Sequence, residues 1–287
     1  MSSFQPAIFT FDHRQHLFLE LTLQPDADLA VALAALREVG RKPGSGVQRV
    51  LALGPALVAA AGFPPLAPFA LAGMPATQRD AWIWLQGSDP ALLFDAGQQA
   101  WARLQSSFIV AQEVQGFYYH DMRDMTGFVD GIGNPQGEKA RAAALVSEGV
   151  ADGGSYVLTQ LWQHNLKEFH ALEVAEQEQV IGRTKADAIE FEGDQMPADS
   201  HVGRTDVARD GIPQSIWRRS VPWGRVLDHG LYFLAFSCER ERFDYLLNQM
   251  LGTHDGVRDR LLDFSEPLTG SYWFAPPESW FFPTGES

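Results

Sequence analysis

The sequence predicts an α+β fold made of two ferredoxin-like halves, each with the element order β-α-β-β-α-β and an antiparallel sheet. Three observations support this prediction. Short segments in which apolar and polar residues alternate are separated by longer Ala- and Leu-rich segments, and the second half of the chain repeats the element order of the first. The composition, with 45% hydrophobic and 20% charged residues in 287, is typical of a globular protein.

In the first half, hydrophobic periodicity and capping residues predict the elements. Residues 16–23 alternate apolar and polar side chains, as a half-buried strand does. Asp26 or Asp28 can cap the helix that follows, and Asp89 with Pro90 opens another. The expected elements are a strand at 16–23, a helix ending near 39, strands at 49–53 and 81–85, a helix at 90–104 and a strand at 108–114.

The second half is expected to repeat this order. We place the domain boundary after the first half, giving domains of residues 1–135 and 136–287. Residues 184–212 are the exception, because they are rich in Asp, Gly and Pro, show little periodicity, and loops of that length are usually functional. The expected elements are a strand at 156–162, helical segments at 166–181, strands at 215–221 and 231–237, a helix at 239–251 and a strand at 271–274.

Charge and cysteine content narrow the possible partners and the compartment. A net charge of −14 with a pI near 4.9 argues against nucleic acid or an anionic membrane surface as partner, because both would repel the protein. The single cysteine, Cys238, excludes an internal disulfide. Residues 1–6 show neither a basic region before an apolar core nor twin arginines, and no apolar stretch is long enough to span a bilayer. A cytoplasmic location is therefore expected.

Residues 127–135 form the most informative segment of the first half. Three glycines within it allow positive φ and close approach of the backbone, and Pro135 fixes its own φ. A loop of this kind can present the carboxylate of Asp130 to a ligand. The alternative is an ordinary glycine-rich turn in which Asp130 bonds its own backbone.

The second half carries a set of motifs in a specific order. With the Asp130 loop, they resemble the dye-decolorising peroxidase family of haem enzymes, whose signature is a Gly-x-x-Asp-Gly loop, a downstream haem-ligating His, and a distal Arg near a Pro-aromatic-Gly turn. The resemblance covers nearly the whole chain and is greatest to compact bacterial members, which carry Ser two residues after that Arg. The segments are VIGRTK at 180–185, PADSHVGRTD at 197–206, SIWRRSVPWG at 215–224, DRLLDF at 259–264 and TGSYWF at 269–274.

The resemblance implies a haem-dependent peroxidase with haem b held mainly by the C-terminal half. Such an enzyme reduces hydrogen peroxide to water through an oxoferryl intermediate and oxidises a small organic donor, dye-like or phenolic, by one-electron steps. Relatives that assemble from several chains imply a homo-oligomer. The alternatives are a porphyrin-processing activity that releases iron from haem, and a non-enzymatic haem carrier or storage protein.

On one side of the haem, the resemblance implies His201 as the ligand of the metal. A neutral imidazole can give one nitrogen to iron while the other donates to a carboxylate that fixes its tautomer. Two carboxylates, Asp259 and Asp263, are candidates for this partner. The family position favours Asp259, and the alternative is a surface Asp paired with a neighbouring Arg.

On the opposite side, the resemblance implies Asp130 and Arg218 as the catalytic pair. Peroxidase chemistry needs a group that moves a proton between the two peroxide oxygens and a cation that stabilises the developing charge. Arg219 is the rival for the second role, but the family's Arg-x-Ser spacing selects Arg218. Ser220 would then bond a water or the peroxide, or else be a structural strand serine.

The haem propionates need donors, and the family position of Arg183 implies that it contacts one of them. Arg204 and Lys185 are weaker candidates for contact with a propionate. Asn134, which closes the Asp130 loop, either lines the haem edge or caps the turn.

The loop departs from the family at Ile132 and Gly133, where many relatives carry Thr-Glu, so metal-ion oxidation that relies on that carboxylate becomes doubtful. Four aromatic residues could relay electrons to the haem or simply fill core. They are Trp162, Trp217, Trp223 and Tyr232.

Overall fold

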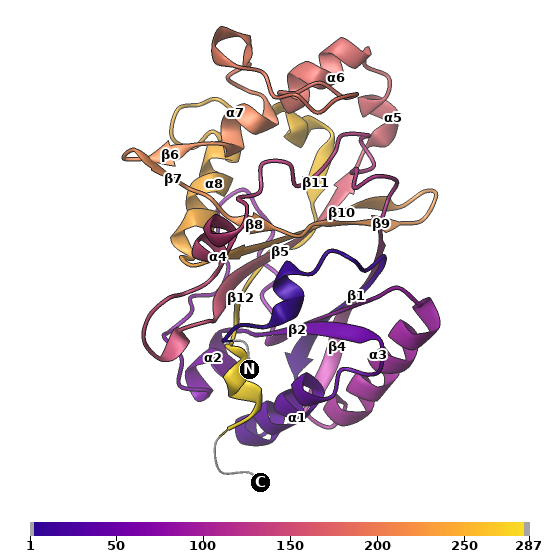
Figure 1. The fold of residues 1–287 in the computed structure, drawn as a ribbon, viewed down its shortest axis with the longest axis vertical. Helices are drawn as coiled ribbons and strands as arrows, with labels where there is room; N and C mark the ends of the chain where they lie inside the picture. The colour runs from indigo at the N-terminus through magenta and orange to yellow at the C-terminus, as the bar shows by residue number, and fades with distance from the viewer. Residues whose placement is uncertain (1–2, 284–287) are drawn as a thin grey trace.

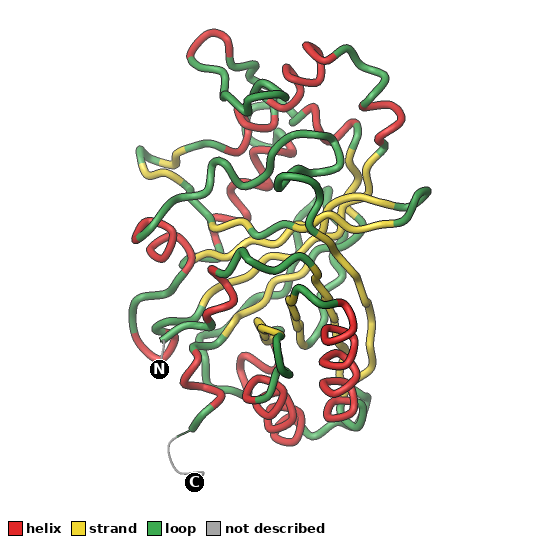
Figure 2. Tube along the Cα trace, turned by 45° about the vertical axis from the view of Figure 1, so that its right-hand side comes forward, coloured by secondary structure: helices red, strands yellow, loops and turns green. Residues whose placement is uncertain are grey.

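The computed structural model describes residues 3–283 (Figure 1), so the outermost residues of the predicted domains 1–135 and 136–287, and the first two of the N-terminal segment 1–6, lie outside the described residues. The predicted α+β class is confirmed. Helices gather at the two ends of the molecule, and the strands cross its middle (Figures 1 and 2).

The N-terminal half has the predicted β-α-β-β-α-β order with one additional short helix, α2. Of the two candidate caps, Asp28 is the one used, because its carboxylate accepts hydrogen bonds from the amides of Ala30 and Val31. Asp89 caps the second long helix in the same way. The elements are η1 (Pro6–Phe9), β1 (Gln15–Leu23), α1 (Leu29–Arg41), β2 (Val47–Leu53), α2 (Pro55–Ala60), β3 (Ala81–Gly87), α3 (Pro90–Leu104) and β4 (Phe108–Phe117).

The C-terminal half repeats the order with more interruptions. Its strands are β5 (Ser155–His164), β6 (Ala208–Arg209), β7 (Ile212–Pro213), β8 (Trp217–Arg218), β9 (Val221–Gly224), β10 (His229–Ser237), β11 (Ser265–Pro267) and β12 (Ser271–Ala275). Its helices are α4 (Glu138–Ala144), η2 (Gly149–Ala151), α5 (Leu166–Phe169), α6 (Val174–Ile181), η3 (Gly193–Gln195), α7 (His201–Thr205), α8 (Glu241–Leu251), η4 (Arg260–Asp263) and η5 (Glu278–Phe281).

Two expected elements differ from the prediction, and the non-periodic region contains a helix. The helical stretch at 166–181 is two helices, because Glu173 returns the chain to an extended conformation before α6. The strand expected at 215–221 is split into β8 and β9. Within the non-periodic region 184–212, the chain forms the short helix α7, which is too short to show a periodic pattern.

The strands of the two halves join into one closed antiparallel ring. Around the ring the order is β5, β12, β2, β3, β1, β4, β9 and β10, and β10 pairs with β5 again. Two single residue pairs join the halves: Phe274 opposite Leu53, and Gly116 opposite Trp223. A side chain at Gly116 would meet Val221 at 2.5 Å, so this seam requires glycine.

Every strand of the ring contributes one face to an interior cluster, which consists of Phe18, Val50, Trp82, Val114, Val157, Val221, Tyr232 and Trp273 together with their neighbours on the same faces. The opposite faces of the strands pack against the helices, for example against Leu36 of α1 and Phe243 of α8. The molecule therefore has an inner core within the ring and outer cores beneath the helices.

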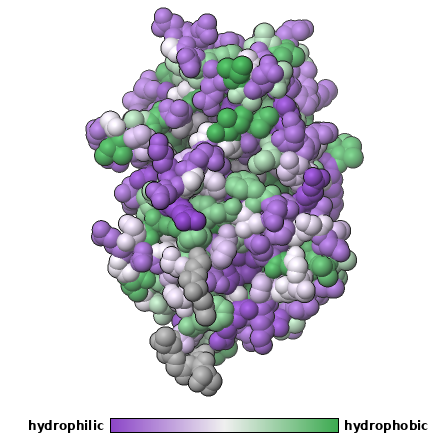
Figure 3. Space-filling model, viewed as in Figure 1, coloured by the Kyte–Doolittle hydropathy of each residue, from purple (hydrophilic) through white to green (hydrophobic). Residues whose placement is uncertain are grey.

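On the face seen in Figure 3, hydrophilic side chains are interspersed with small apolar groups, as on most globular proteins. Within residues 3–283, no helix combines the length and the apolar character that crossing a bilayer requires.

Candidate active site

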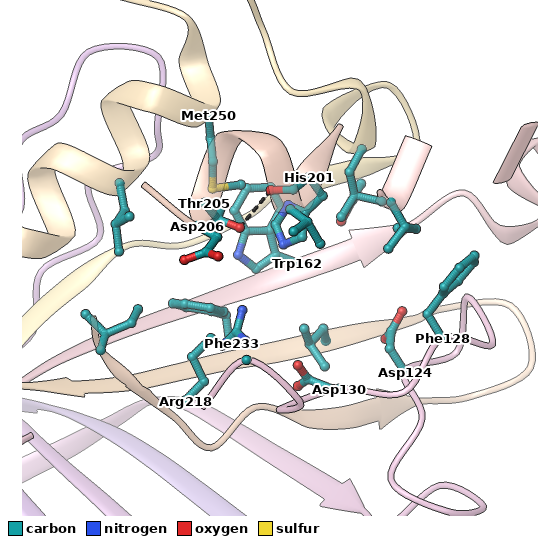
Figure 4. Close-up of a pocket in the computed structure, with 18 of the residues that line it drawn as sticks. Asp124, Phe128, Asp130, Trp162, His201, Thr205, Asp206, Arg218, Phe233 and Met250 are labelled. Carbon is teal, nitrogen blue, oxygen red and sulfur yellow. Dashed lines mark hydrogen bonds between the residues drawn. The ribbon is translucent and has the colours of Figure 1, made fainter. Parts of the chain in front are cut away.

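A cavity lies between the strands β5 and β10 on one side and the helices α7 and α8 on the other, with the Asp130 loop along its edge (Figure 4). Its walls are mostly apolar. They include Leu158 and Trp162 of β5, Leu231 and Phe233 of β10, and Leu246 and Met250 of α8. His201 lies on one wall, and Asp130 and Arg218 lie on the wall that faces it.

His201 is the first residue of α7, and the hydroxyl of Ser200 caps this helix by accepting from the amide of Gly203 at 3.2 Å. The imidazole of His201 is 23% exposed and lines the cavity. Its Nδ1 lies 2.7 Å from a carboxylate oxygen of Asp259. Because Nδ1 is engaged, Nε2 is the nitrogen that can bind a ligand in the cavity.

Asp259 is fully buried and held from both sides. Its second carboxylate oxygen accepts from the amide of Leu261 at 2.9 Å, and its own amide donates to the carbonyl of Met250 at 2.8 Å. The rival carboxylate, Asp263, is half exposed and pairs with Arg258 instead. The structure therefore brings Asp259 to His201, while Asp263 lies in a surface ion pair.

The opposite wall carries Asp130 and Arg218. The carboxylate of Asp130 accepts from the amide of Gly131 at 2.7 Å, and Gly131 has the positive φ of +78° that this turn requires. Asp130 thus bonds the adjacent backbone amide and also lines the cavity. The loop is therefore both an ordinary glycine-rich turn and a loop that presents a carboxylate to the cavity. Arg218 ends β8 and reaches the same cavity.

Of the two alternatives for Asn134, the structure favours a role in holding the loop over a place in the cavity lining. Asn134 is buried, and it does not belong to the lining of this cavity. Its side-chain amide donates to the carbonyl of Arg218 at 2.8 Å, and its side-chain oxygen accepts from the amide of Arg218 at 2.9 Å. Asn134 therefore clamps the Asp130 loop to β8 at the residue that presents the guanidinium.

Arg219 points away from the cavity into the interior. It is 6% exposed, and its guanidinium donates to the carbonyl of Ile8 at 2.8 Å and lies over the rings of Phe11 and Trp84. Burial lowers the pKa of Arg219 to about 9. The two adjacent arginines thus face different environments, and Arg218 is the one at the cavity.

Ser220 does not belong to the lining of the main cavity. Its hydroxyl is buried, lacks a hydrogen-bond partner among the described residues, and lines a second cavity. Asp130 and Arg218 form the wall shared by the two cavities. Ser220 therefore lies behind the wall formed by Asp130 and Arg218, on the side away from His201.

Arg183 lines the main cavity and is 6% exposed. Within residues 3–283, its buried Nε has no hydrogen-bond partner. Burial, followed by the charge of Arg218, lowers the pKa of Arg183. A buried guanidinium with an unused donor fits an anionic group, so the residues present suit a ligand with an apolar body, an anionic edge and a metal that binds imidazole.

The other two candidate cations lie elsewhere. Arg204 binds Asp255 at 2.7 Å and the carbonyl of Gln249, so it ties α7 to α8. Lys185 donates to the side chain of Gln177. Neither Arg204 nor Lys185 lines the cavity.

Several polar residues of the cavity were not predicted from the sequence. Asp124 and His164 both line it and lie 3.1 Å apart, although 40 positions separate them. Burial acts to raise the pKa of Asp124, but the charge of His164 and hydrogen bonds from His164 and Thr126 hold it well below its usual range. Glu190 lines the cavity from the non-periodic region 184–212. The length and lack of periodicity of that region were the one feature of the sequence that pointed to a functional residue there.

At Ile132 and Gly133, where the loop differs from many relatives, the glycine has a steric role. Ile132 is 42% exposed, whereas Gly133 lines the cavity. A Cβ at Gly133 would lie 3.1 Å from the guanidinium of Arg218. The glycine therefore leaves room for Arg218 at this position.

The four aromatic residues proposed as relays fall into two groups. Trp162 lines the cavity, and its carbonyl accepts from the indole of Trp223 at 3.1 Å. Trp217 and Tyr232 lie in the interior cluster.

The C-terminal domain family of Dyp-type peroxidases matches residues 121–280, which contain every residue of the two facing walls. The chain belongs to the Dyp-type peroxidase family. The identification from sequence motifs is therefore confirmed. A dye-decolorizing peroxidase of Mycolicibacterium paratuberculosis is 36% identical over 208 residues, or 70% of this chain and 59% of the relative. One from Mycobacterium tuberculosis is 35% identical over 208 residues, or 70% and 62%. The match thus spans about 60% of these relatives' lengths.

Solved structures of the family resemble the whole fold. A dye-decolorizing protein from V. cholerae has a TM-score of 0.87 at 35% identity, covering 96% of this chain and 98% of that one. DyPB from Rhodococcus jostii RHA1 has a TM-score of 0.88 at 31% identity, covering 98% of both chains. A variant of the latter was solved in complex with heme, with a TM-score of 0.88 at 29% identity, covering 99% of this chain and 100% of that one.

Proposed function

We propose that this protein is a haem-dependent peroxidase, with haem b as cofactor, that reduces hydrogen peroxide to water and oxidises a small organic donor in one-electron steps. The main support is the facing arrangement in one apolar cavity: His201 with Asp259 on one wall, and Asp130 with Arg218 on the other. The names of the family relatives and the haem complex of a Rhodococcus jostii variant support the same function.

Haem, when bound, would supply the redox chemistry, and the chain would supply a ligand, a proton carrier and fixed charges. His201 Nε2 would hold the iron. Asp259 fixes the tautomer of His201 by accepting from Nδ1, and its negative charge makes the imidazole a stronger donor. The guanidinium of Arg183, with its unused Nε, would bind a propionate.

On the facing wall, Asp130 would take a proton from one peroxide oxygen and return it to the departing oxygen, which leaves as water. Arg218 would stabilise the negative charge that develops between these two proton transfers. Asn134 positions Arg218 by holding both backbone groups of that residue. The apolar walls exclude bulk water, which strengthens each of these charge interactions.

Absorption spectroscopy tests the proposal. The purified protein, supplied with haem, should show a Soret band that shifts on addition of hydrogen peroxide and returns when a phenol or dye is added. A band that never responds to peroxide would indicate a carrier, for which Asp130 and Arg218 have no use. Release of iron with free porphyrin would indicate a porphyrin-processing enzyme, and absence of a Soret band would overturn haem binding altogether. Assembly into a homo-oligomer stays a prediction, which a mass measurement in solution tests.

A further inference from the structure

Glu20 of β1 lies inside the strand ring, where the proposed peroxidase mechanism does not use it. It is 2% exposed and shares its face of β1 with Phe18 of the interior cluster. The hydrogen bonds to its carboxylate come from neutral hydroxyls, those of Tyr232 at 2.9 Å and Thr159 at 3.4 Å. A carboxylate surrounded by aromatic rings is costly to ionise, so its presence calls for an explanation.

The bond from Tyr232 has a defined direction. The indole N–H of Trp82 donates to the phenol oxygen of Tyr232 at 2.9 Å, so that oxygen accepts from Trp82 and its own O–H donates to Glu20. Tyr232 is fully buried and stacks on Phe18 with ring centroids 4.0 Å apart. The phenolic proton therefore points at a carboxylate oxygen, and no solvent separates the two groups.

Tyr232 also lies directly behind the wall of the cavity. Its neighbours on β10, Leu231 and Phe233, line the cavity, and Figure 4 labels Phe233 there. Because successive strand residues point to opposite faces, Tyr232 points into the ring from the same short stretch of strand. One layer of sheet therefore separates the phenol from the cavity.

A phenol that loses an electron becomes a strong acid, so its oxidation in a dry interior requires a nearby base. Glu20 is such a base. Burial raises the pKa of Glu20 to about 7, which makes it a better proton acceptor than an ordinary carboxylate, and the more distant charge of Arg79 is the cation that acts on it. Burial also raises the pKa of Tyr232, which keeps the phenol protonated until it is oxidised.

We propose that Tyr232 and Glu20 form a buried tyrosyl radical site, an inference that rests on the proposed peroxidase function. One electron passes from the Tyr232 phenol to the peroxide-oxidised haem. The O–H bond of Tyr232 breaks, and its proton forms an O–H bond on the carboxylate of Glu20. The products are a neutral phenoxyl, which keeps its hydrogen bond from Trp82, and a neutral carboxylic acid. The site retains one oxidising equivalent within the ring when no donor is bound.

A second tyrosine–carboxylate pair serves as the matched control. Tyr272 is also buried, and its hydroxyl donates to Asp244 at 2.6 Å. Asp244, however, is ion-paired with Arg240 at 2.5 Å, so a proton from Tyr272 would have to displace a cation that already balances this carboxylate. Tyr272 should therefore not hold the radical.

The experiment is electron paramagnetic resonance on haem-loaded enzyme, freeze-quenched after one equivalent of hydrogen peroxide without donor. A tyrosyl signal is expected above pH 7, absent from Tyr232→Phe and unchanged in Tyr272→Phe. In Glu20→Gln it should fall at least tenfold, to the level of wild type two pH units below 7, where about one Glu20 in a hundred is ionised. Tyr232→Phe keeps the stacked ring, and if that variant does not fold, Glu20→Gln decides alone.

A readout without haem accompanies this one. In the apoprotein, infrared spectroscopy should show a protonated carboxyl band that titrates near pH 7 and is missing in Glu20→Gln. Absence of that band, or a tyrosyl signal that survives in Tyr232→Phe, overturns the radical site. A Soret band that responds to peroxide without any tyrosyl signal also overturns it and leaves the peroxidase proposal standing. A Soret band that never responds to peroxide overturns both.

Discussion

His201 is the residue on which cofactor binding should depend, because its Nε2 is the free imidazole nitrogen on the cavity wall. We predict that His201→Ala loses stable haem binding and regains a Soret band when imidazole is added, since a small ligand can occupy the vacated position. Titration with haem measures this. His254→Ala, at an exposed position, is the control and should bind haem normally. A wild-type spectrum in His201→Ala would remove this residue from the role.

Asp259 should control the electronic character of His201. Asp259→Asn is expected to keep haem and to raise the reduction potential of the iron, because a neutral amide oxygen is a weaker acceptor for the imidazole N–H. Spectroelectrochemistry measures the shift. Asp263→Asn should leave the potential unchanged, since Asp263 pairs with Arg258 at the surface. Equal potentials in wild type and Asp259→Asn would contradict this assignment.

The two adjacent arginines allow a matched comparison at the opposite wall. Arg218→Leu should slow the reaction with peroxide by about two to three powers of ten, the usual cost of removing one oriented charge donor. Asp130→Asn should slow it less if water can carry the proton. Arg219→Leu should barely change the rate but should lower the melting temperature, because the carbonyl of Ile8 loses its buried donor.

Stopped-flow absorption of the three variants measures these rates. A slow Arg219→Leu beside a normal Arg218→Leu would reverse the assignment of the two residues. If all three variants react at the wild-type rate, the facing wall is not where peroxide is activated.

At the residue scale, the sequence predicted which residues gather at the cavity, but it was a poorer guide to the hydrogen-bond partners of each residue. Arg-x-Ser spacing selected Arg218, which does line the cavity. Asn134 was ambiguous because its partner is 84 positions away, and no local pattern reports such a contact. Ser220 was expected to bond a water or the peroxide, or to be a structural strand serine, and its hydroxyl lines the second cavity, which Asp130 and Arg218 also line.

At the scale of elements, the Asp130 loop and β8 act as one piece because Asn134 joins them. Asn134→Ala removes two buried hydrogen bonds and should lower the free energy of unfolding by about 2 kcal/mol. It should also slow the peroxide reaction about ten- to a hundredfold while haem affinity stays unchanged, because Arg218 would lose its fixed position.

Chemical denaturation and stopped-flow rates check both effects. Gln136→Ala is the control, since among the described residues its side chain donates to the carbonyl of Asn134 alone. An Asn134→Ala variant that loses stability but reacts at the wild-type rate would reduce Asn134 to a purely structural role.

Elements with strong periodicity were predicted within a few residues, and those without it were not. The helices α1, α3 and α8 and the long strands carry repeating apolar faces because they pack on a core along their whole length. The helix α7 has five residues and begins at the cavity, so its position is determined by the cap at Ser200 and the contact with Asp259. No hydrophobic pattern encodes such contacts.

At the scale of the whole molecule, Glu20 should make stability depend on pH. Its pKa is about 7 in the folded protein and near 4.5 when exposed, so the folded state holds this proton more tightly. Its contribution is therefore complete below pH 4.5 and is lost as pH rises to 7, by about 3 kcal/mol. Glu20→Gln should remove this loss and become more stable than wild type above pH 7.

Urea unfolding of wild type and Glu20→Gln across this pH range measures the difference between their free energies of unfolding. Glu113→Gln is the control, because Glu113 is exposed on β4. A difference that does not change with pH would mean that the pKa of Glu20 is the same in the folded and the unfolded protein, which would contradict this prediction.

The closed ring was not predictable, because each seam between the halves is a single residue pair, and two separate sheets satisfy the same hydrophobic pattern. Because the ring closes between the halves, the two halves are arranged like the subunits of a dimer that are joined by one chain. Contacts such as Arg49 with Glu278 at 2.8 Å and Trp82 with Tyr232 are then interface contacts, and the connecting chain acts as a linker that raises the effective concentration of one piece for the other. Either half alone would expose two open strand edges, and such edges pair readily with strands of other chains.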